Sequence, residues 1–575
     1  MGAAVFPLAE VHRGLRGVAY TVFEGVRPEP MAVEILGVLK DALGPGRDLI
    51  LGRLAGVKPE YTGVVAGMSG SPVYVEGRLV GALSYRIGQF SKEPIAGITP
   101  IEQMLEVRDG AGRAAGVSGP LAATGGGARA AEMQAMETPL VFGGYSPEVV
   151  ERFGDRFRAA GLTPVSGLGG RDAKAVQPEP LVPGSAVSAV LVEGDLSMTG
   201  TCTVTYVDPS RLLACGHPIT QFGPVEMPMT KAEVVATLPS PLNAFKIVNA
   251  TETVGSFTED RASAILGRFG QTARMIPVSV EVRRAGAGAA PKTFHFSVLD
   301  NRELTPQAML VSVYQTLQET NTATAEMSYR MQGELLVGRR PGPDGRAGED
   351  LPPVRLEAML APSEINSGAI GAALFVNDRF SRVYGSLAEQ PVIRGLRLEM
   401  EAIPERRSAV INGARLGRTE ARAGEVLEVE ANLRPFRAAE QVERVEIKLP
   451  DSLQPGTVRV LVSDGATLDR LTMRAGSGLG LGAAAGRDSG LAGTVGQINR
   501  MHPNDRVYVT LLDHAAQAVL DSAAMEEVPL SMVNVLGPLR EAQKLQLTGE
   551  SAVELGAAPT GYALSGSEVL TLLVR

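Results

Sequence analysis

The amino-acid sequence predicts a mainly β protein built of several domains, and its composition and length are the observations behind this prediction. The chain has 575 residues, with 67 Gly, 38 Pro and no Trp, and aromatic residues make up only 5%. This mixture is typical of many short strands joined by tight turns rather than of long helices. Because a domain usually takes ~100–200 residues, we expect roughly three to five domains.

The charge pattern argues against a nucleic-acid partner, and the hydropathy pattern argues against a membrane-spanning helix. The net charge is −8, and acidic and basic residues are spread along the chain without a basic stripe, so we expect no nucleic-acid partner. No apolar run reaches the ~20 residues of a membrane-spanning helix, so we expect no transmembrane segment. No histidine or cysteine has a partner at metal-ligand spacing, so we expect no metal and no cofactor.

The N-terminal part reads as short strands punctuated by Gly and Pro. Residues 72–85, Pro-Val-Tyr-Val-Glu-Gly-Arg-Leu-Val-Gly-Ala-Leu-Ser-Tyr, predict a hairpin that turns at Glu76-Gly77. Residues 109–128 are rich in Gly and Ala and predict a linker. After it, Ser146-Pro147-Glu148 is typical of a helix start, and the apolar residues that follow share one face, which predicts a helix near 147–160.

The rest of the chain returns to strand patterns. These run from Ala186 past residue 335, and residues 395–465 alternate so clearly that they predict a small antiparallel, immunoglobulin-like sandwich. Residues 475–496 are Gly-rich. We therefore divide the chain into a serine-bearing β-barrel half, a linker with a helix, a histidine-bearing β-barrel half, a β-rich extension, a β-sandwich, and a Gly-rich linker with a C-terminal β domain: 1–108, 109–182, 183–280, 281–400, 401–465 and 466–575.

The most informative stretch is Gly67-Met68-Ser69-Gly70-Ser71-Pro72. A serine nucleophile needs a sharp turn that presents its hydroxyl, and backbone N–H groups aimed at the developing oxyanion. Glycines on both sides of Ser69 permit that turn, and predicted strands lead into and out of it. We therefore predict Ser69 as the nucleophile, with the N–H groups of Gly67 and Ser69 as the oxyanion hole. Ser71 is the alternative nucleophile, and a Gly/Ser-rich turn without chemistry is the alternative interpretation.

Among five histidines, His217 is the best candidate for a general base, because that role needs an imidazole held rigidly. It follows a predicted strand in Leu-Leu-Ala-Cys-Gly-His-Pro. Upstream, Cys202 and Cys215 flank a predicted hairpin. If Asp208-Pro209 is its turn, the two cysteines face each other and a disulfide is possible. Two buried thiols are the other interpretation.

These two motifs, with their surroundings, resemble the SpoIVB family of serine peptidases, which is known from sporulation signalling. The resemblance rests on the serine motif and hairpin at 67–84, on 10–38, and on Thr-Val-Thr-Tyr-Val-Asp-Pro-Ser-Arg-Leu-Leu-Ala-Cys-Gly-His at 203–217, and covers about a third of the chain. It implies a chymotrypsin-like double β-barrel with endopeptidase activity towards a protein or peptide substrate. Further β-sandwich domains would follow the double barrel.

The sequence departs from that family in two ways. The serine half precedes the histidine half here, so the module would be circularly permuted, which a triad tolerates because it is defined by geometry. The acidic partner that the family carries shortly before the serine is missing at 51–56, Leu-Gly-Arg-Leu-Ala-Gly. Asp48 and Asp260 are the replacement candidates, although a turn or a surface ion pair would also explain each. We find no PDZ-like segment of the kind that the family uses for regulation.

Three functions remain open at this point. The first is a serine endopeptidase, and the second is an inactive pseudopeptidase that serves as an envelope protein-binding scaffold. The third is a structural envelope protein in which residues 1–105 and 183–270 do not pack together. The start of the chain has no signal-peptide pattern while the family is exported, so we expect a periplasmic or extracellular protein whose signal peptide is absent from this sequence, with a cytoplasmic location as the alternative. The C-terminal β domains, about 280–575, would bind substrate, an envelope protein partner or the cell envelope.

Overall fold

The structure is a computed structural model. It describes residues 4–575 apart from 88–92, 109–132, 221–222, 241–243, 286–289, 322–324, 341–347, 387–388, 477–489, 514–515, 521–522 and, within 529–550, all but Met532, Val535 and Gln546–Thr548. The chain forms two compact units. The first comprises residues 1–276 and 295–315, and the second comprises residues 277–294 and 316–575. Both units are rich in strands, so the prediction of a mainly β protein is confirmed.

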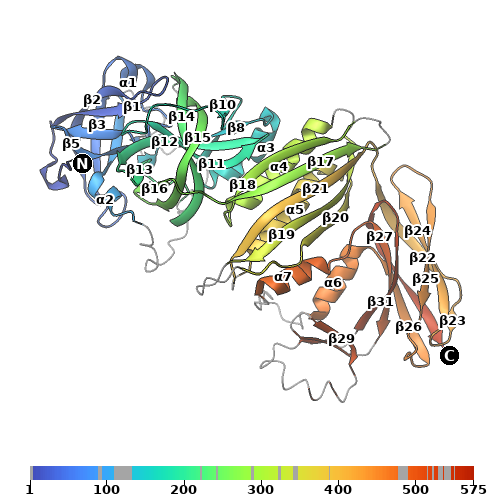
Figure 1. The fold of residues 1–575 in the computed structure, drawn as a ribbon. Coiled ribbons are helices and arrows are strands. Elements are labelled where there is room, and N and C mark those ends of the chain that lie inside the picture. The colour runs from blue at the N-terminus through green and yellow to red at the C-terminus, as the bar shows by residue number, and fades with distance from the viewer. Residues whose placement is uncertain are drawn as a thin grey trace. The chain divides into compact units, whose positions relative to one another are not determined.

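The first unit begins with a closed six-stranded barrel, which we call the first barrel (Figure 1). Its strands are β1 (Arg16–Thr21), β2 (Glu29–Leu39), β3 (Leu49–Ala55), β4 (Pro72–Val75), β5 (Arg78–Ile87) and β6 (Ile95–Pro100). They pair in the order β1-β2-β3-β6-β5-β4, and β4 pairs back on β1. A 3₁₀ turn (Leu8–Glu10) and the short helices α1 (Val57–Thr62) and α2 (Ile101–Leu105) complete this part.

The predicted hairpin of the first barrel is confirmed. Strands β4 and β5 are joined by Glu76 and Gly77, both at positive φ, 51° and 75°. This is the backbone that two-residue hairpin turns require. The interior of the barrel is a cluster of buried aliphatic side chains that includes Val33, Ile50 and Val73.

A second group of six strands follows in the same unit, and we call it the second barrel. Its strands are β11 (Ala186–Gly194), β12 (Ser197–Val207), β13 (Arg211–Ala214), β14 (Gly223–Leu238), β15 (Phe245–Arg261) and β16 (Ala264–Phe269). They pair in the order β11-β12-β13-β16-β15-β14, and β14 pairs back on β11. Numbered within each barrel, the two strand orders are the same, 1-2-3-6-5-4.

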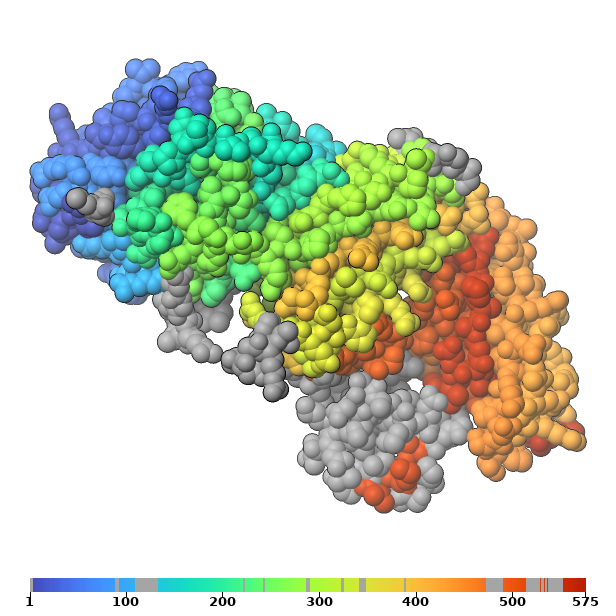
Figure 2. All heavy atoms as spheres, in the orientation of Figure 1, coloured from blue at the N-terminus to red at the C-terminus, as the bar shows by residue number. Residues whose placement is uncertain are grey.

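The two barrels pack on each other. Residue Gly25 of the first barrel forms a bridge with Val234 of β14, and Ala66 forms one with Phe245 of β15. In the space-filling view the blue atoms of the first barrel and the green atoms of the second barrel are in contact (Figure 2). This contact contradicts the hypothesis of a structural protein in which residues 1–105 and 183–270 do not touch.

The segment between the barrels contains more regular structure than the predicted linker. Helix α3 (Pro147–Arg158) is confirmed, with Ser146 Oγ accepting from Val149 N at 3.4 Å. The strands β7 (Met133–Ala135), β8 (Thr138–Gly143), β9 (Leu162–Ser166) and β10 (Gly169–Arg171) were not predicted. They are short strands that pair on β5, β12, β8 and β15, so tertiary pairing rather than local pattern makes them strands. The predicted linker at 109–128 lies outside the described residues.

The second unit begins with a sheet that is accompanied by helices. Its strands are β17 (Met275–Arg284), β18 (Lys292–Leu299), β19 (Ser328–Arg339), β20 (Val354–Leu360) and β21 (Pro391–Ile403), of which β18 continues into the first unit from His295. Helix α4 (Leu304–Thr320), which lies in the first unit up to Gln315, interrupts the run of strands that the sequence predicted from Ala186 past residue 335, and α5 (Gly368–Tyr384) lies in the extension predicted to be β-rich. Helix α4 is buried on almost every side, so it carries no amphipathic stripe that would reveal it.

The predicted β-sandwich is present and takes more of the chain than residues 401–465. One layer contains β22 (Ser408–Leu416), β24 (Val426–Pro435), β25 (Gln441–Lys448) and β32 (Ala563–Ser565). The other layer contains β23 (Glu420–Ala421), β26 (Gly456–Ser463), β27 (Arg506–Asp513), β31 (Ser551–Pro559) and β33 (Ser567–Val574). One apolar core joins the two layers.

The remaining elements of the second unit lie between β26 and β31 in the sequence. Helices α6 (Gly465–Gly476) and α7 (Gly490–Asn499) are followed by a small sheet of β28 (Ala516–Leu520), β29 (Ala523–Val528) and β30 (Gln546–Thr548). Across the described residues, no helix has both the length and the apolar character needed to span a bilayer.

Candidate active site

The serine motif forms a buried loop between α1 and β4, and we call residues 65–71 the serine loop. Ser69 is fully buried, and Gly67 and Gly70 have φ of +93° and +94°. A Cβ at Gly70 would lie 1.9 Å from Thr203 O and 2.5 Å from Cys215 N. Glycine is therefore required at position 70 both for its backbone conformation and for the close approach of the second barrel.

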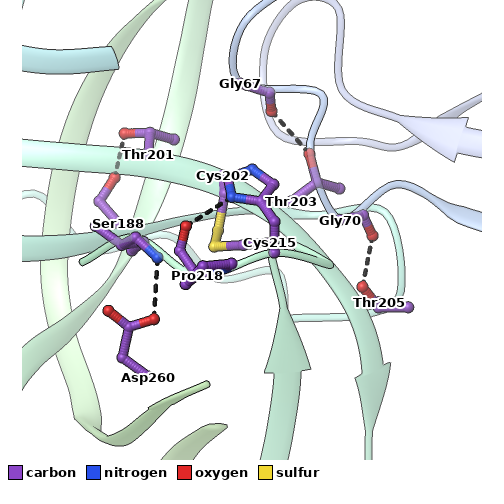
Figure 3. The surroundings of a disulfide bond; sticks show 12 residues. Gly67, Gly70, Ser188, Thr201, Cys202, Thr203, Thr205, Cys215, Pro218 and Asp260 are labelled. Atoms are coloured by element: carbon purple, nitrogen blue, oxygen red, sulfur yellow. Dashed lines mark hydrogen bonds between the residues drawn. A yellow bond between two sulfur atoms is a disulfide. The ribbon is translucent and has the colours of Figure 1, made fainter. Parts of the chain in front are cut away.

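Thr203 of β12 fastens the serine loop to the second barrel. Its N–H donates to Ser69 O at 2.7 Å, and its hydroxyl donates to Gly67 O at 3.0 Å. Two residues on, the Thr205 hydroxyl donates to Gly70 O at 2.7 Å (Figure 3). The second barrel thus binds the carbonyls of Gly67, Ser69 and Gly70, which fixes the loop without using the Ser69 hydroxyl.

His217 lies in a turn that follows β13, and we call residues 214–220 the histidine turn. Cys215 has φ of +66°, and Gly216 N donates to Ala214 O at 2.9 Å, so the chain makes a three-residue turn of a rare and strained kind. A disulfide joins Cys215 to Cys202 of β12 (Figure 3). This is the pairing that the sequence left open against two free thiols.

The histidine turn is also held against the first barrel. Cys215 N donates to Thr203 O at 3.2 Å, and Thr99 Oγ1 of β6 donates to Gly216 O at 2.7 Å. A Cβ at Gly216 would lie 3.0 Å from Ser84 Cβ of β5. Because Thr203 bonds both to Ser69 and to Cys215, the serine loop and the histidine turn are fastened to the same residue.

His217 is only 2% exposed and has a defined tautomer. Its Nδ1 lies 2.7 Å from Pro218 O, and a carbonyl oxygen can only accept, so Nδ1 carries the proton and Nε2 has a free lone pair. Burial lowers the pKa of His217 to about 4, against a smaller opposing effect of the Pro218 carbonyl. The ring is therefore neutral near pH 7, in the form that can accept a proton at Nε2.

The two candidate catalytic atoms are buried and unpaired. Among the described residues, neither Ser69 Oγ nor His217 Nε2 has a hydrogen-bond partner, so they do not bond to each other. A buried polar atom without a partner costs about 1–3 kcal/mol. The fold brings the two loops together while leaving the hydroxyl and the imidazole unengaged.

The two predicted acids have other partners. Asp260, at the end of β15, is fully buried and binds the histidine turn through its main chain: Oδ1 accepts from Ile219 N at 2.9 Å, and Oδ2 accepts from the N–H and hydroxyl of Thr220 at 2.6 Å each. Asp48 accepts from Lys40 Nζ at 2.6 Å and from Asp41 N at 3.0 Å, and these contacts lower its pKa. Pro218 O, rather than either carboxylate, bonds to His217 Nδ1.

The predicted oxyanion donors are buried and free. In the described part of the chain, neither Gly67 N–H nor Ser69 N–H is paired with an acceptor, whereas the neighbouring Met68 and Gly70 donate to Val65 O and Leu83 O. The alternative nucleophile, Ser71, donates its hydroxyl to Met68 O at 2.6 Å. The main-chain N–H of Ser71 donates to the same carbonyl at 3.0 Å, so the turn is closed by the main chain as well as by the hydroxyl.

Sequence reasoning missed Lys246, which lies beneath the serine loop. It is 1% exposed, its side-chain carbons lie 3.4–3.5 Å from where a Cβ of Gly67 would be, and its Nζ donates to Thr21 Oγ1 at 2.7 Å. Burial lowers the pKa of Lys246 to about 7. A lysine within a strand normally indicates an exposed position, so only its apolar neighbours in Asn-Ala-Phe-Lys-Ile-Val (243–248) could have signalled burial.

Neither a metal-site search nor comparison with known proteins identifies this site. Over the described residues, no group of three or more His, Cys, Asp or Glu side chains has the spacing of a metal site. No protein-family model, no curated protein and no solved structure matches the chain.

Proposed function

We propose that the chain is a serine endopeptidase in which Ser69 is the nucleophile and His217 is the general base. The observation that carries this proposal is the pair of unpartnered atoms, Ser69 Oγ and His217 Nε2, in two buried loops that are both bonded to Thr203. Evolution seldom retains buried polar atoms without partners unless they serve a reaction or a ligand. The same loops carry the two free N–H groups of Gly67 and Ser69.

The proposed reaction follows from these groups. Ser69 Oγ attacks the carbonyl carbon of the substrate while its proton passes to His217 Nε2. The negative oxygen of the tetrahedral intermediate accepts hydrogen bonds from Gly67 N–H and Ser69 N–H. His217 then gives the proton to the departing amine, and a water molecule activated by the same imidazole releases the acyl group from Ser69. Engagement needs the two atoms to approach each other, and catalytic hydrogen bonds often tighten only when substrate binds.

We assign the orienting role to Pro218 O and a positioning role to Asp260. The carbonyl fixes the proton on Nδ1, which is the task that a carboxylate performs in a triad. Asp260 holds the two residues that follow Pro218, and so holds the carbonyl itself. The site would then be a Ser–His dyad with a main-chain partner.

Labelling with a fluorophosphonate probe tests this proposal. We expect the label on Ser69, located by peptide mass spectrometry, and none in Ser69→Ala. His217→Gln should lower the labelling rate by at least ~10²-fold, the typical contribution of a general base. Ser71→Ala is the matched control and should still label. Labelling that persists in Ser69→Ala would exclude Ser69 as the nucleophile.

A pseudopeptidase that binds an envelope protein is the second candidate function. The missing bond between Ser69 Oγ and His217 Nε2 favours it, together with the absence of a carboxylate on Nδ1. It predicts no label on Ser69 in any variant, including those described in the next subsection, while a binding partner is still captured by the intact chain.

We also propose that the two barrels are related to the SpoIVB family. Two six-stranded groups with one strand order, carrying serine and histidine at their junction, are the features expected of a permuted chymotrypsin-like peptidase of the SpoIVB type. The Cys202–Cys215 disulfide favours an oxidising compartment, so we propose export from the cytoplasm.

A further inference from the structure

One edge of strand β5 is shared by three segments placed end to end. Ala82 faces Pro72 of β4, Leu83 bonds to the serine loop through Gly70 N at 2.7 Å and Ser71 O at 2.9 Å, and Ser84 O accepts from Met136 N at 2.8 Å. Beyond this point β7 takes over the edge, with Ala135 opposite Tyr85. The chain at Met136 therefore reaches the serine loop directly along the edge of β5.

The direction of β7 brings its C-terminal end to Ser69. Both β4 and β7 are antiparallel to β5, so β7 runs towards the serine loop, and Met136 follows its last residue. A peptide paired in this way arrives at the loop that holds the free N–H groups. Adding an extended strand to a sheet edge is a recurring way for proteins to bind peptides.

Met136 is the anchor of this segment. Gln134 and Ala135 are exposed, whereas Met136 is 2% exposed and belongs to the same cluster of buried apolar side chains as Val65 and Met68 of the serine loop. Within 133–137 Met136 is the one fully buried side chain, which is what a specificity pocket imposes on a bound peptide.

The segment then crosses the junction between the two barrels. Glu137 Oε1 accepts from Arg86 Nη2 at 2.8 Å, and from Thr138 the chain continues as β8 on β12 of the second barrel. The chain therefore follows the course of a substrate that binds one barrel before the reacting bond and the other barrel after it. Its presence also fits the complete burial of Ser69.

We propose that residues 133–137 occupy, in cis, the substrate groove of the candidate site. Residues 133–137 therefore indicate the class of substrate. It is an extended peptide that pairs antiparallel with β5. It carries an unbranched apolar side chain in the place of Met136, followed by an acidic residue. This inference rests on the proposed peptidase function and adds to it the substrate and the reason for the closed site.

The test compares fluorophosphonate labelling rates at Ser69 in the full chain. Met136→Asp puts a carboxylate into an apolar pocket, which should expel the segment and speed labelling by at least ~10-fold. Val176→Asp is the matched control, because it puts the same charge in place of an exposed apolar side chain outside residues 133–137 and should leave the rate unchanged. Met136→Ala provides a milder variant in case Met136→Asp does not fold, and thermal melting checks both.

A peptide added in trans supplies the second measurement. Acetyl-Met-Gln-Ala-Met-Glu-Thr-amide, the sequence of residues 133–138, should slow labelling of Met136→Ala or be cut after its second Met. The same peptide with Val at that Met should do neither, because Val replaces the long unbranched side chain with a shorter, β-branched one.

The outcomes separate this inference from the proposed function. Equal labelling of wild type and both Met136 variants would overturn the cis occupancy and leave the peptidase proposal standing. An inert peptide, or one that works equally well with Val, would overturn the assigned substrate class. No label on Ser69 in any variant would overturn the peptidase proposal itself.

Discussion

The two barrels share one strand order but differ in what they bury. Strands β2 and β3 of the first barrel bury aliphatic side chains such as Ile35 and Leu54 and no hydroxyl group. Strands β11 and β12 of the second barrel bury a series of hydroxyls: Ser188, Ser197, Thr199, Thr201, Thr203 and Thr205. The first barrel buries fewer hydroxyls, Thr21, Ser84 and Thr99, of which Thr99 holds the histidine turn, whereas Thr203 and Thr205 of the second barrel hold the serine loop.

The largest expected effect comes from Gly70→Ala, which breaks the contact between the barrels. The new methyl group would collide with Thr203 O, so we expect a loss of well over 3 kcal/mol, within the range of the most damaging substitutions (~4–5 kcal/mol). Gly77→Ala is the control, since Gly77 also has a positive φ but nothing within 4 Å of an added Cβ, and should cost about 1–2 kcal/mol. Chemical denaturation measures both, and equal losses would refute a tight junction.

Removing the disulfide should come next. Cys202 and Cys215 are 13 positions apart, and a loop of about this length is stabilised by ~3 kcal/mol when closed. The double variant with Ala at both positions should therefore melt at a lower temperature, and reduced wild type should match it. A reduced wild type that melts like the oxidised protein would show that the bond adds nothing to the second barrel.

Thr203→Val tests whether the hydroxyls act between the barrels or only within one. It leaves Gly67 O buried without its donor, so we expect a loss of about 1–3 kcal/mol. The control is the double variant Ser188→Ala/Thr201→Val, which removes both members of a 2.6 Å pair within the second barrel and should be nearly neutral. The reverse ranking in denaturation would contradict the role of the Thr203 hydroxyl in holding the serine loop.

The smallest expected effect is the change in stability per pH unit that Lys246 causes. Its pKa is about 7 in the folded chain and ordinary when unfolded, so the unfolded state binds more protons between these values and folding stability rises with pH there. Lys246→Met should therefore exceed wild type in stability at pH 7, and its advantage should shrink by up to ~1.4 kcal/mol per pH unit towards pH 10. Thermal melts at several pH values check this, and a constant advantage would mean that Lys246 does not titrate in that window.

The sequence was most informative where local chemistry decides the structure. The hairpin at Glu76-Gly77, the capped helix after Ser146 and the glycine-framed serine loop all depend on residues close in sequence. The pairing of Cys202 with Cys215 was a possibility that a hairpin geometry already contained.

Main-chain partners and long-range contacts decided what could not be predicted. The partner of His217 is the carbonyl of Pro218, and a main-chain atom leaves no residue-type signal. Asp260 was chosen as an acid for the imidazole, but it binds the backbone two residues further on. Helix α4 was hidden by burial on all sides.

The attachment of β7 and β8 to different barrels has a practical consequence for the handling of this protein. A cut between Met136 and Glu137 would leave one new end in the β5 sheet and the other in the β12 sheet. Because the two barrels pack on each other, the nicked molecule would stay together. It would elute like the intact chain from a sizing column. Only a denaturing gel would reveal the two pieces, so apparent homogeneity under native conditions is no proof of an unbroken backbone.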